Sequence, residues 1–328
     1  MPVLRVGIAQ IAPVPLDRAQ TLARVANAVA EAGSNGARLV CFGETFVPGY
    51  PFWLSRLDGA RFDHPDIKAM HARYLESAVV IERGDLRPVC DACRDAGAAA
   101  VVGIAERPGD RGGHTLFASA VTIAPDGTIA SVHRKLVPTY EERLAWGPGD
   151  AHGLVAHRFL EPFTLGTLNC WENWMPLARA TLQAQGVDLH VAIWPGSSAL
   201  TRDSTRFVAL ESRAFVVSAS SRMTADDLPV DFPHRERILA SPETAESGVL
   251  FEGGSAVAGP DGSWIVEPNV EFQGLIYADL DQARVLEERQ NFDPAGHYGR
   301  PELLGLRVDR RRPQLLTEFY HLSKDKEA

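Results

Sequence analysis

Short apolar runs alternate with longer amphipathic segments along most of the chain. Apolar runs of this length predict strands over residues 3–11, 37–42, 98–106, 116–124, 128–134, 155–159, 163–168, 188–194 and 214–218. Amphipathic spacing predicts helices over residues 17–33, 63–80, 85–96, 175–185, 203–213 and 281–290, the first of them capped by Asp17. Residues 224–247 are polar and contain proline, which predicts a long surface loop. Strands that alternate with helices predict an α/β fold whose helices lie outside the sheets.

Two hairpin signals repeat within this pattern. Ser119-Ala120-Val121 precedes Pro125-Asp126-Gly127, and Ser255-Ala256-Val257 precedes Pro260-Asp261-Gly262. Each proline-aspartate-glycine turn lies between two strand-like segments, which is typical of a hairpin. Hairpins argue against purely parallel sheets. The repeat therefore predicts two similar half-units, each with a mixed sheet, related by a pseudo-twofold axis and packed face to face.

Length and composition narrow the class of protein. The chain has 328 residues, of which 45% are hydrophobic, and this suits one domain over residues 1–305 with a tail over 306–328. The net charge of −9 argues against nucleic acid and anionic membranes as partners. No apolar run is long enough to span a bilayer, and the N-terminus lacks a signal-peptide pattern. Four cysteines indicate a reducing compartment, so we expect a cytoplasmic protein.

The most informative stretch surrounds Cys170. It follows the strand predicted over residues 163–168 and precedes a helix with Pro176 in its first turn. A thiol on such a turn faces the positive end of a helix dipole, which lowers the thiol pKa, and nearby backbone N–H groups can hold a developing negative charge. A lone cysteine is equally often a buried small hydrophobe. Only a base and a cation elsewhere in the chain would favour the nucleophile.

Two charged residues at other strand ends supply that pair. Glu44 follows the strand over residues 37–42, and Lys135 closes the strand over residues 128–134. Alone, Glu44 would be read as a solvated loop carboxylate and Lys135 as an exposed edge-strand lysine. Together with Cys170 they provide a nucleophile, a proton carrier and a positive charge, which hydrolysis of a carbon–nitrogen bond through a thioester requires.

Other enzyme chemistries find little support in the sequence. It contains no G-x-S-x-G of a serine hydrolase, no G-x-G-x-x-G, no P-loop and no H-E-x-x-H, so we expect no cofactor and no metal. Cys90 and Cys93 have the spacing of half a zinc or redox site, but no second pair accompanies them and they fall on a predicted helix.

At these residues the chain resembles the nitrilase superfamily of carbon–nitrogen hydrolases. The string from Glu44 to Pro51 resembles the glutamate motif, Arg134 to Thr139 the lysine motif, and Cys170 to Leu177 the nucleophile motif. The Cys-Trp-Glu order favours the nitrilase branch, as does the string from Gly296 to Pro301. The resemblance extends from about residue 3 to residue 306.

The resemblance implies an αββα sandwich of two mixed β-sheets with helices on the outer faces. It also implies homodimers that extend the sandwich to eight layers, and often spiral oligomers, although the segment after Pro301 is short for long filaments. It assigns Cys170 as nucleophile, Glu44 as general acid and base, Lys135 as the stabilising charge and Glu142 as a second glutamate, unless Glu141 takes that place. Aromatic residues are candidates for the substrate pocket or for plain packing: Tyr50, Trp146, Trp171, Trp174 and Trp194. We expect His133 and His297 to be structural.

The implied reaction converts an organic nitrile into a carboxylic acid and ammonia. Cyanide or an amide is the alternative substrate. A non-catalytic scaffold is a third possibility, which the intact Glu44, Lys135 and Cys170 set disfavours because a scaffold has no need of all three.

Overall fold

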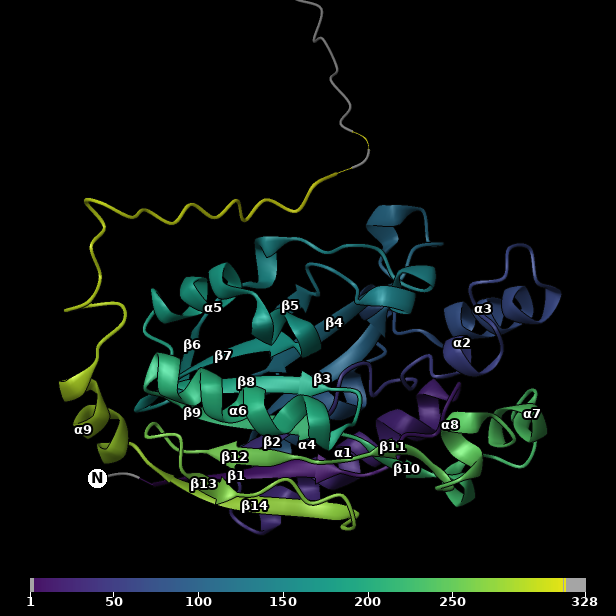
Figure 1. Ribbon diagram of the computed structural model, residues 1–328, viewed down its shortest axis with the longest axis horizontal. Helices are drawn as coiled ribbons and strands as arrows, with labels where there is room; N and C mark the ends of the chain where they lie inside the picture. Colours follow the sequence, from purple (N-terminus) through teal and green to yellow (C-terminus); the bar gives the residue numbers. More distant parts are fainter. Residues whose placement is uncertain (1–2, 315, 317–328) are drawn as a thin grey trace, which may run out of the picture.

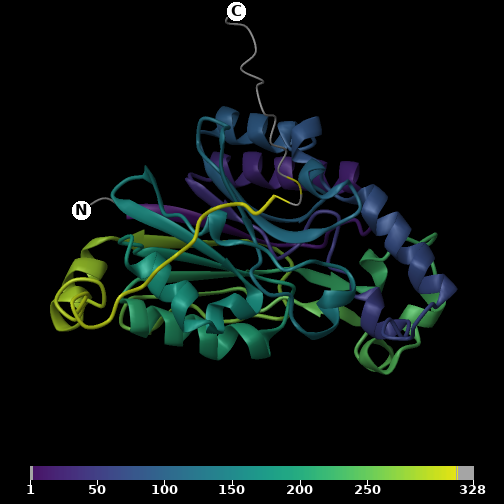
Figure 2. The same cartoon turned by 90° about the horizontal axis from the view of Figure 1, so that it is seen from above.

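Two six-stranded mixed β-sheets lie face to face at the centre of the molecule, and helices cover their outer faces (Figures 1 and 2). The computed structural model describes residues 3–314 and 316. Apolar side chains of both sheets, such as Ile8 in one and Leu165 in the other, form the core between them. The predicted αββα sandwich is confirmed.

The first sheet has the strand order β14-β1-β2-β3-β4-β5. Strands β1, β2 and β3 are parallel, and β14 and β4 run antiparallel to their neighbours. The strands are β1 (Val3–Gln10), β2 (Leu39–Cys41), β3 (Ala99–Glu106), β4 (Phe117–Ile123), β5 (Ile129–Arg134) and β14 (Gly274–Asp281).

The second sheet repeats this arrangement in the order β6-β7-β8-β9-β12-β13. Strands β7, β8 and β9 are parallel, and β6 and β12 run antiparallel to them. Each sheet ends in one of the two predicted hairpins, β4–β5 and β12–β13. The strands are β6 (His157–Leu160), β7 (Phe163–Asn169), β8 (Leu189–Trp194), β9 (Phe215–Ser220), β12 (Ala256–Ala258) and β13 (Trp264–Val266).

Four helices form the outer layers. Helices α1 (Arg18–Ser34) and α4 (Arg87–Ala96) pack on the first sheet, and α5 (Pro176–Gln183) and α6 (Ser198–Ser212) pack on the second. The side chain of Asp17 caps α1 by accepting the backbone N–H of Gln20 at 2.8 Å, as predicted. Helix α9 (Ala283–Asn291) follows β14.

The prediction of a surface loop over residues 224–247 was wrong. Strands β10 (Arg222–Thr224) and β11 (Val249–Glu252) pair as a small sheet, with α7 (Arg235–Leu239) and α8 (Pro242–Ala245) between them. Buried side chains such as Ile238 and Phe251 pack this unit against α2 (Trp53–Arg56) and α3 (Pro65–Ser77). Helices this short show no complete apolar period, so the sequence pattern did not reveal them.

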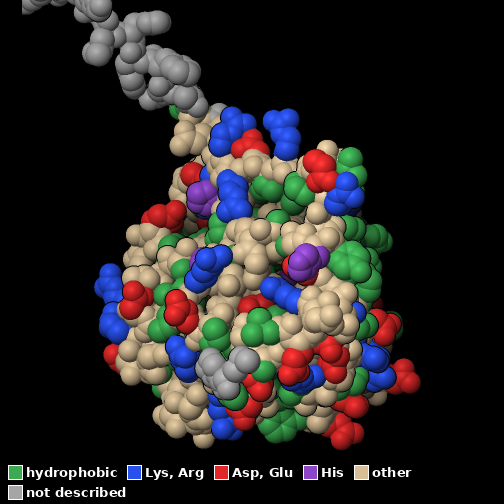
Figure 3. All heavy atoms as spheres, turned by 90° about the vertical axis from the view of Figure 1, so that its left-hand side faces the viewer, with side chains coloured by type: hydrophobic (Ala, Val, Ile, Leu, Met, Phe, Trp, Pro, Cys, Tyr) green, Lys and Arg blue, Asp and Glu red, His purple; other side chains and the backbone are tan. Residues whose placement is uncertain are grey.

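Short 3₁₀ turns connect several elements. They are η1 (Ile81–Arg83), η2 (Gly109–Arg111), η3 (Tyr140–Leu144), η4 (Ala151–Gly153), η5 (Cys170–Trp174) and η6 (Ala225–Asp227). Among the described residues, no helix is both long and apolar enough to cross a membrane. Acidic and basic side chains are interspersed on the face that Figure 3 shows.

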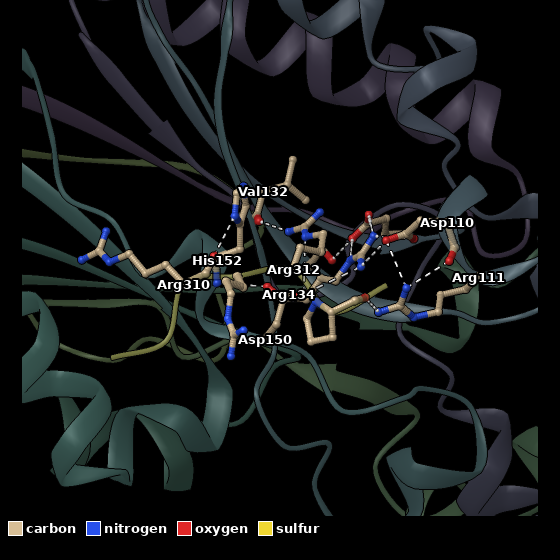
Figure 4. A network of polar contacts seen from close by, with 12 residues as sticks. Asp110, Arg111, Val132, Arg134, Asp150, His152, Arg310 and Arg312 are labelled. Atoms are coloured by element: carbon tan, nitrogen blue, oxygen red, sulfur yellow. Dashed lines mark hydrogen bonds and ion pairs between the residues drawn. The ribbon is translucent and has the colours of Figure 1, made fainter. Parts of the chain in front are cut away.

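The described part of the tail runs along the edge strand β5 (Figure 4). Arg312 donates to the carbonyl of Val132 at 3.1 Å and lies 3.4 Å from the Asp150 carboxylate. His152 contacts the carbonyl of Arg310 at 3.0 Å. The tail thus occupies one backbone carbonyl of an otherwise open sheet edge, that of Val132.

Candidate active site

The ends of three strands, from both sheets, bring the candidate catalytic residues to one edge of the sandwich. Lys135 directly follows β5, Cys170 directly follows β7, and Glu44 lies three positions beyond the end of β2. Ligands and reacting groups of open α/β folds gather at the carboxyl ends of such strands. The structure therefore places Glu44, Lys135 and Cys170 together although they are far apart in the sequence.

Lys135 lies at the centre of this cluster. Its Nζ is 2.8 Å from Glu44 Oε1 and 2.7 Å from Glu142 Oε2. The carboxylate oxygens of Glu44 and Glu142 and the Sγ of Cys170 all lie within 4.8 Å of one another. All four side chains are buried. One ammonium is thus shared by two carboxylates beside the thiol.

Glu44 is held by a contact between the two sheets. Its backbone N–H donates to the carbonyl of Trp194 at the end of β8, at 3.0 Å. Gly43 makes this approach possible, because a Cβ there would lie 2.7 Å from Ser221 Oγ and 2.8 Å from the Trp194 carbonyl oxygen. The position of Glu44 therefore depends on strands of both sheets.

Glu142 is fixed by three donors. Besides Lys135, the backbone N–H of Thr139 donates to Oε2 at 2.6 Å, and the hydroxyl of Tyr50 donates to Oε1 at 2.9 Å. The turn η3 exposes part of Glu141 and points Glu142 inward. Glu142, rather than Glu141, is therefore the second glutamate of the cluster.

Cys170 begins η5 with a positive φ of 49°, an unfavourable conformation for a residue with a side chain. Asn173 donates to its carbonyl at 2.8 Å and helps to hold this turn. The long helix α5 begins only at Pro176, so the turn η5 separates the thiol from the dipole of that helix. The elbow is present, but its positive helix end is weaker than expected.

The expectation of a low thiol pKa was wrong. Burial raises the pKa of Cys170 well above its usual value, and the Glu44 carboxylate raises it further; Lys135 and the backbone N–H of Trp171 lower it by less. The thiol is therefore neutral in the free protein at neutral pH. A nearby base would be needed to generate the thiolate.

The pKa values of the two other central groups, Glu44 and Lys135, are also shifted. Burial raises the pKa of Glu44 to about 8, because it outweighs the attraction of Lys135, and Glu142 adds to the rise. Burial alone would lower the pKa of Lys135, but Cys170 and the two carboxylates outweigh it, so its ammonium stays charged. Glu44 is thus a carboxyl group that exchanges protons near neutral pH.

The aromatic candidates separate into two groups. Tyr50 and Trp146 are packed edge to face with ring centroids 5.5 Å apart, and Lys135 Nζ lies 5.8 Å from the Trp146 ring centroid. Trp194 is buried against Cys170. Trp171 and Trp174 have 49% and 40% of their surface exposed, and Trp174 stacks on Phe207 of α6. The structure thus brings three of the five aromatics to the cluster and places two on the outside.

The cluster does not fit a metal ion. Glu44, Glu142 and Cys170 have the spacing of three metal ligands. However, both carboxylates already bind the Lys135 ammonium, which takes the place that a cation would occupy. Cys90 and Cys93 lie on α4, where Cys93 is part of the apolar packing against the first sheet.

The sequence interpretation missed Glu172 as a member of the site's framework. Its buried carboxylate contacts His133 at 3.0 Å and accepts the backbone N–H of Leu136 and of Asn169. Its signal is the Cys-Trp-Glu string, which in the sequence indicates only the branch of the resembled family. His133 is buried in this framework, whereas His297 is exposed.

Known proteins share both the sequence pattern and the fold. The family model described as carbon-nitrogen hydrolase matches residues 5–290. An aliphatic nitrilase of Sinorhizobium fredii (strain HH103) is 34% identical over 316 residues, which cover 93% of this chain and 95% of the relative. A cyanide hydratase of Gibberella baccata is 31% identical over 304 residues, covering 88% and 81%.

Solved structures agree on the architecture. A mutant amidase of Nesterenkonia sp. AN1 superposes with a TM-score of 0.61 at 20% identity, covering 88% of this chain and 95% of that chain. At this identity the likeness concerns the fold alone.

The fold and the buried glutamate–lysine–cysteine cluster define a hydrolase of carbon–nitrogen bonds. The chain belongs to the carbon–nitrogen hydrolase family, the nitrilase superfamily, and within it to the nitrilase branch. The resemblance inferred from the motifs is confirmed.

Proposed function

We propose that this protein is a nitrilase that hydrolyses an organic nitrile to the carboxylic acid and ammonia. The observation that carries the proposal is the Lys135 ammonium held by Glu44 and Glu142, with the Cys170 thiol within 4.8 Å of both carboxylates. The similarity to aliphatic nitrilases supports the choice of a nitrile as substrate.

The reaction begins with proton transfer from the Cys170 thiol to Glu44. The thiolate adds to the nitrile carbon, and the nitrogen takes the proton, so a thioimidate forms. Water adds to this carbon and gives a tetrahedral centre that bears sulfur, nitrogen and oxygen. Ammonia leaves once its nitrogen is protonated, and a thioester remains. A second water hydrolyses the thioester, which releases the acid and regenerates the thiol.

Glu44 and Lys135 decide between acid and amide as product. If the tetrahedral centre expels the thiolate instead of ammonia, an amide is released. Glu44 favours acid because it protonates the nitrogen, and Lys135 stabilises the oxyanion that collapses. A difference of about 1.4 kcal/mol between the two barriers changes the ratio tenfold. We expect acid as the main product, with a minor amide fraction that grows for bulky or electron-poor nitriles.

The test is ammonia release from a panel of nitriles, amides and cyanide, with chromatography of acid and amide. We expect turnover of at least one nitrile and no turnover by a folded Cys170→Ala variant, with folding checked by far-UV circular dichroism. Turnover of amides without any nitrile would overturn the proposal. Amide as the dominant product from both an aromatic and an aliphatic nitrile would remove Glu44 from its role as proton donor to nitrogen.

Cyanide is the second candidate substrate. Cyanide hydratases are among the relatives at 31% identity, close to the 34% of the aliphatic nitrilase. The same panel separates the two, because a cyanide-specific enzyme turns over cyanide and no organic nitrile.

We further propose that two copies associate through the α5–α6 layer. Exposed apolar side chains gather there: Trp171, Trp174, Leu177, Phe207 and Leu210. Two four-layer sandwiches joined by this layer give the eight layers that the family resemblance implies. Exposed patches of this kind usually mark an interface.

All four cysteines are free, which suits a reducing, cytoplasmic setting for the protein.

Light scattering with size-exclusion chromatography tests the association. Leu177→Glu places a charge in the patch and should yield monomers. Ala30→Glu on the exposed face of α1 is the matched control and should leave the dimer intact. A monomeric wild type, or a Leu177→Glu dimer, would contradict this interface.

A further inference from the structure

Glu172 joins the two segments that carry Lys135 and Cys170. Its Oε1 accepts the backbone N–H of Leu136 at 2.5 Å, and its Oε2 accepts the backbone N–H of Asn169 at 2.8 Å. Leu136 directly follows Lys135 in the first half of the sandwich, and Asn169 directly precedes Cys170 in the second. One carboxylate therefore binds the immediate neighbours of both residues.

His133 adds a third donor to the same carboxylate. Its Nε2 lies 3.0 Å from Oε2 and 3.1 Å from Oε1 of Glu172. The Nδ1 of His133 is buried without a partner, which assigns the ring proton to Nε2 and makes the histidine a donor. Both Glu172 and His133 are almost fully buried, so water does not compete for these bonds.

The charge of Glu172 is matched by this environment. Burial opposes its ionisation, but His133 and the two backbone N–H groups outweigh burial and hold the pKa of the Glu172 carboxyl below its usual value. The negative charge of Glu172 also contributes to the raised pKa of Glu44, after burial and Glu142. A carboxylate that is buried with three donors is a rigid link, because moving any donor away leaves charge unpaired.

We propose that Glu172 is a positioning residue that clamps the Lys135 segment to the Cys170 elbow and so sets the distance between ammonium and thiol. The inference rests on Cys170 being the nucleophile of the proposed function. The conformation of Cys170, with its positive φ, needs support of this kind, since neither its backbone nor a long helix dipole stabilises it.

Replacing the carboxylate by an amide tests the clamp at nearly constant volume. Glu172→Gln keeps one acceptor oxygen and turns the other into a donor, which then faces a donor of the protein. Either the Leu136 or the Asn169 bond is lost, and the two segments separate. Because Lys135 lowers the pKa of Cys170, a more distant ammonium should make the thiol harder to ionise.

The readout is the rate of alkylation by iodoacetamide as a function of pH, measured by mass spectrometry on the peptide that contains Cys170. Cys90, which is half-buried on α4, serves as the internal reference in the same digest. We expect Glu172→Gln to move the pH midpoint for Cys170 upward by about one unit and to leave that for Cys90 unchanged. Nitrile turnover, as kcat/KM, should fall about a hundredfold through kcat.

Asp188→Asn is the matched control. Asp188 is another buried carboxylate that accepts a backbone N–H, that of Thr164 at 2.7 Å, but it lies at the opposite end of β8 from the cluster. Its replacement should affect thermal stability without moving the Cys170 midpoint. Glu172→Asp keeps the charge but is too short to reach both segments, so it should shift the midpoint in the same direction as Gln.

The clamp would be overturned if folded Glu172→Gln had an unchanged or lower pH midpoint for alkylation of Cys170. It would also be overturned if Glu172→Asp had the same midpoint as the wild type. If Glu172→Gln does not fold, Glu172→Asp and His133→Gln decide the question by the same comparison. The alkylation measurement does not depend on nitrile turnover, so it tests the clamp separately. If the wild type turns over no nitrile but Glu172→Gln still shifts the Cys170 midpoint, the proposed function is overturned and the clamp stands.

Discussion

At the scale of single residues, the central feature is one ammonium shared by two carboxylates. Lys135 Nζ contacts Glu44 and Glu142 at 2.8 and 2.7 Å, so removal of Lys135 leaves both buried carboxyl groups without their cation, and removal of Glu44 leaves the ammonium with one partner. Glu44→Gln and Lys135→Ala should each reduce kcat/KM by about a hundredfold to ten-thousandfold. The double variant should be little worse than the slower single variant, because residues that act as a unit are not additive. Two single variants that stay within about tenfold of wild type would refute the triad.

The pH dependence of turnover should report the ionisation of Glu44. Burial raises its pKa from 4.5 to about 8, and only the deprotonated carboxylate can accept the thiol proton. The sign is therefore a rise of kcat/KM with increasing pH, which levels off above about 8. Initial rates at low substrate from pH 5 to 9 measure it, because kcat/KM follows the free enzyme. A rate that is already constant from pH 5.5 upward would contradict the role of Glu44 as base.

Individual residues were predictable where a motif surrounds them. Glu44, Lys135, Cys170 and Glu142 lie together as expected, and their catalytic roles remain predictions. The pKa of the thiol was not predictable, because its rise depends on burial by distant strands and on Glu44. The exposure of Trp171 and Trp174 was not predictable either, because the sequence around Cys170 does not show which way these side chains point.

At the scale of elements, the link between the β2 and β8 ends is the most sensitive point. The Glu44 N–H reaches the Trp194 carbonyl only because residue 43 lacks a side chain. Gly43→Ala should therefore displace Glu44 and reduce turnover by about a hundredfold. Gly109→Ala is the control, because a Cβ at that position meets nothing within 4 Å. Kinetics and thermal melts of both variants test this, and a fully active Gly43→Ala variant would contradict it.

Elements with a full apolar period were predicted well, and short or polar ones were not. Helix α1 and the strands β1 and β7 are close to the predicted ranges, whereas α6 begins at Ser198 rather than at residue 203. The first turn of α6 contains few apolar residues, so the apolar spacing of the sequence indicates a helix only from residue 203 onward. Strand β14 was missed, although its partner β1 requires it at the edge of the sheet. Its pairing is set by tertiary contacts, which local patterns do not contain.

At the scale of the whole molecule, the tail is connected to the segment that carries Lys135. The Asp150 carboxylate forms an ion pair with Arg312 of the tail and lies 3.8 Å from Arg134, the residue before Lys135 (Figure 4). The backbone N–H of Gly149 donates to the Lys135 carbonyl at 2.8 Å. The tail, the loop before η4 and the end of β5 therefore form one connected unit.

Two adjacent arginines allow this connection to be tested. Arg312→Ala removes the hydrogen bond to Val132 and the ion pair with Asp150, both of which involve partly buried groups, and should lower the free energy of unfolding by about 1 kcal/mol. For a protein of this size that corresponds to a melting temperature lower by about 2 °C. Arg311→Ala is the matched control, because Arg311 pairs with Asp309 within the tail and is 87% exposed. Differential scanning calorimetry of both variants measures the difference. Equal melting temperatures would show that the tail rests on β5 without stabilising it. A lower melting temperature and a lower kcat for Arg312→Ala alone would show that the tail supports the position of Lys135.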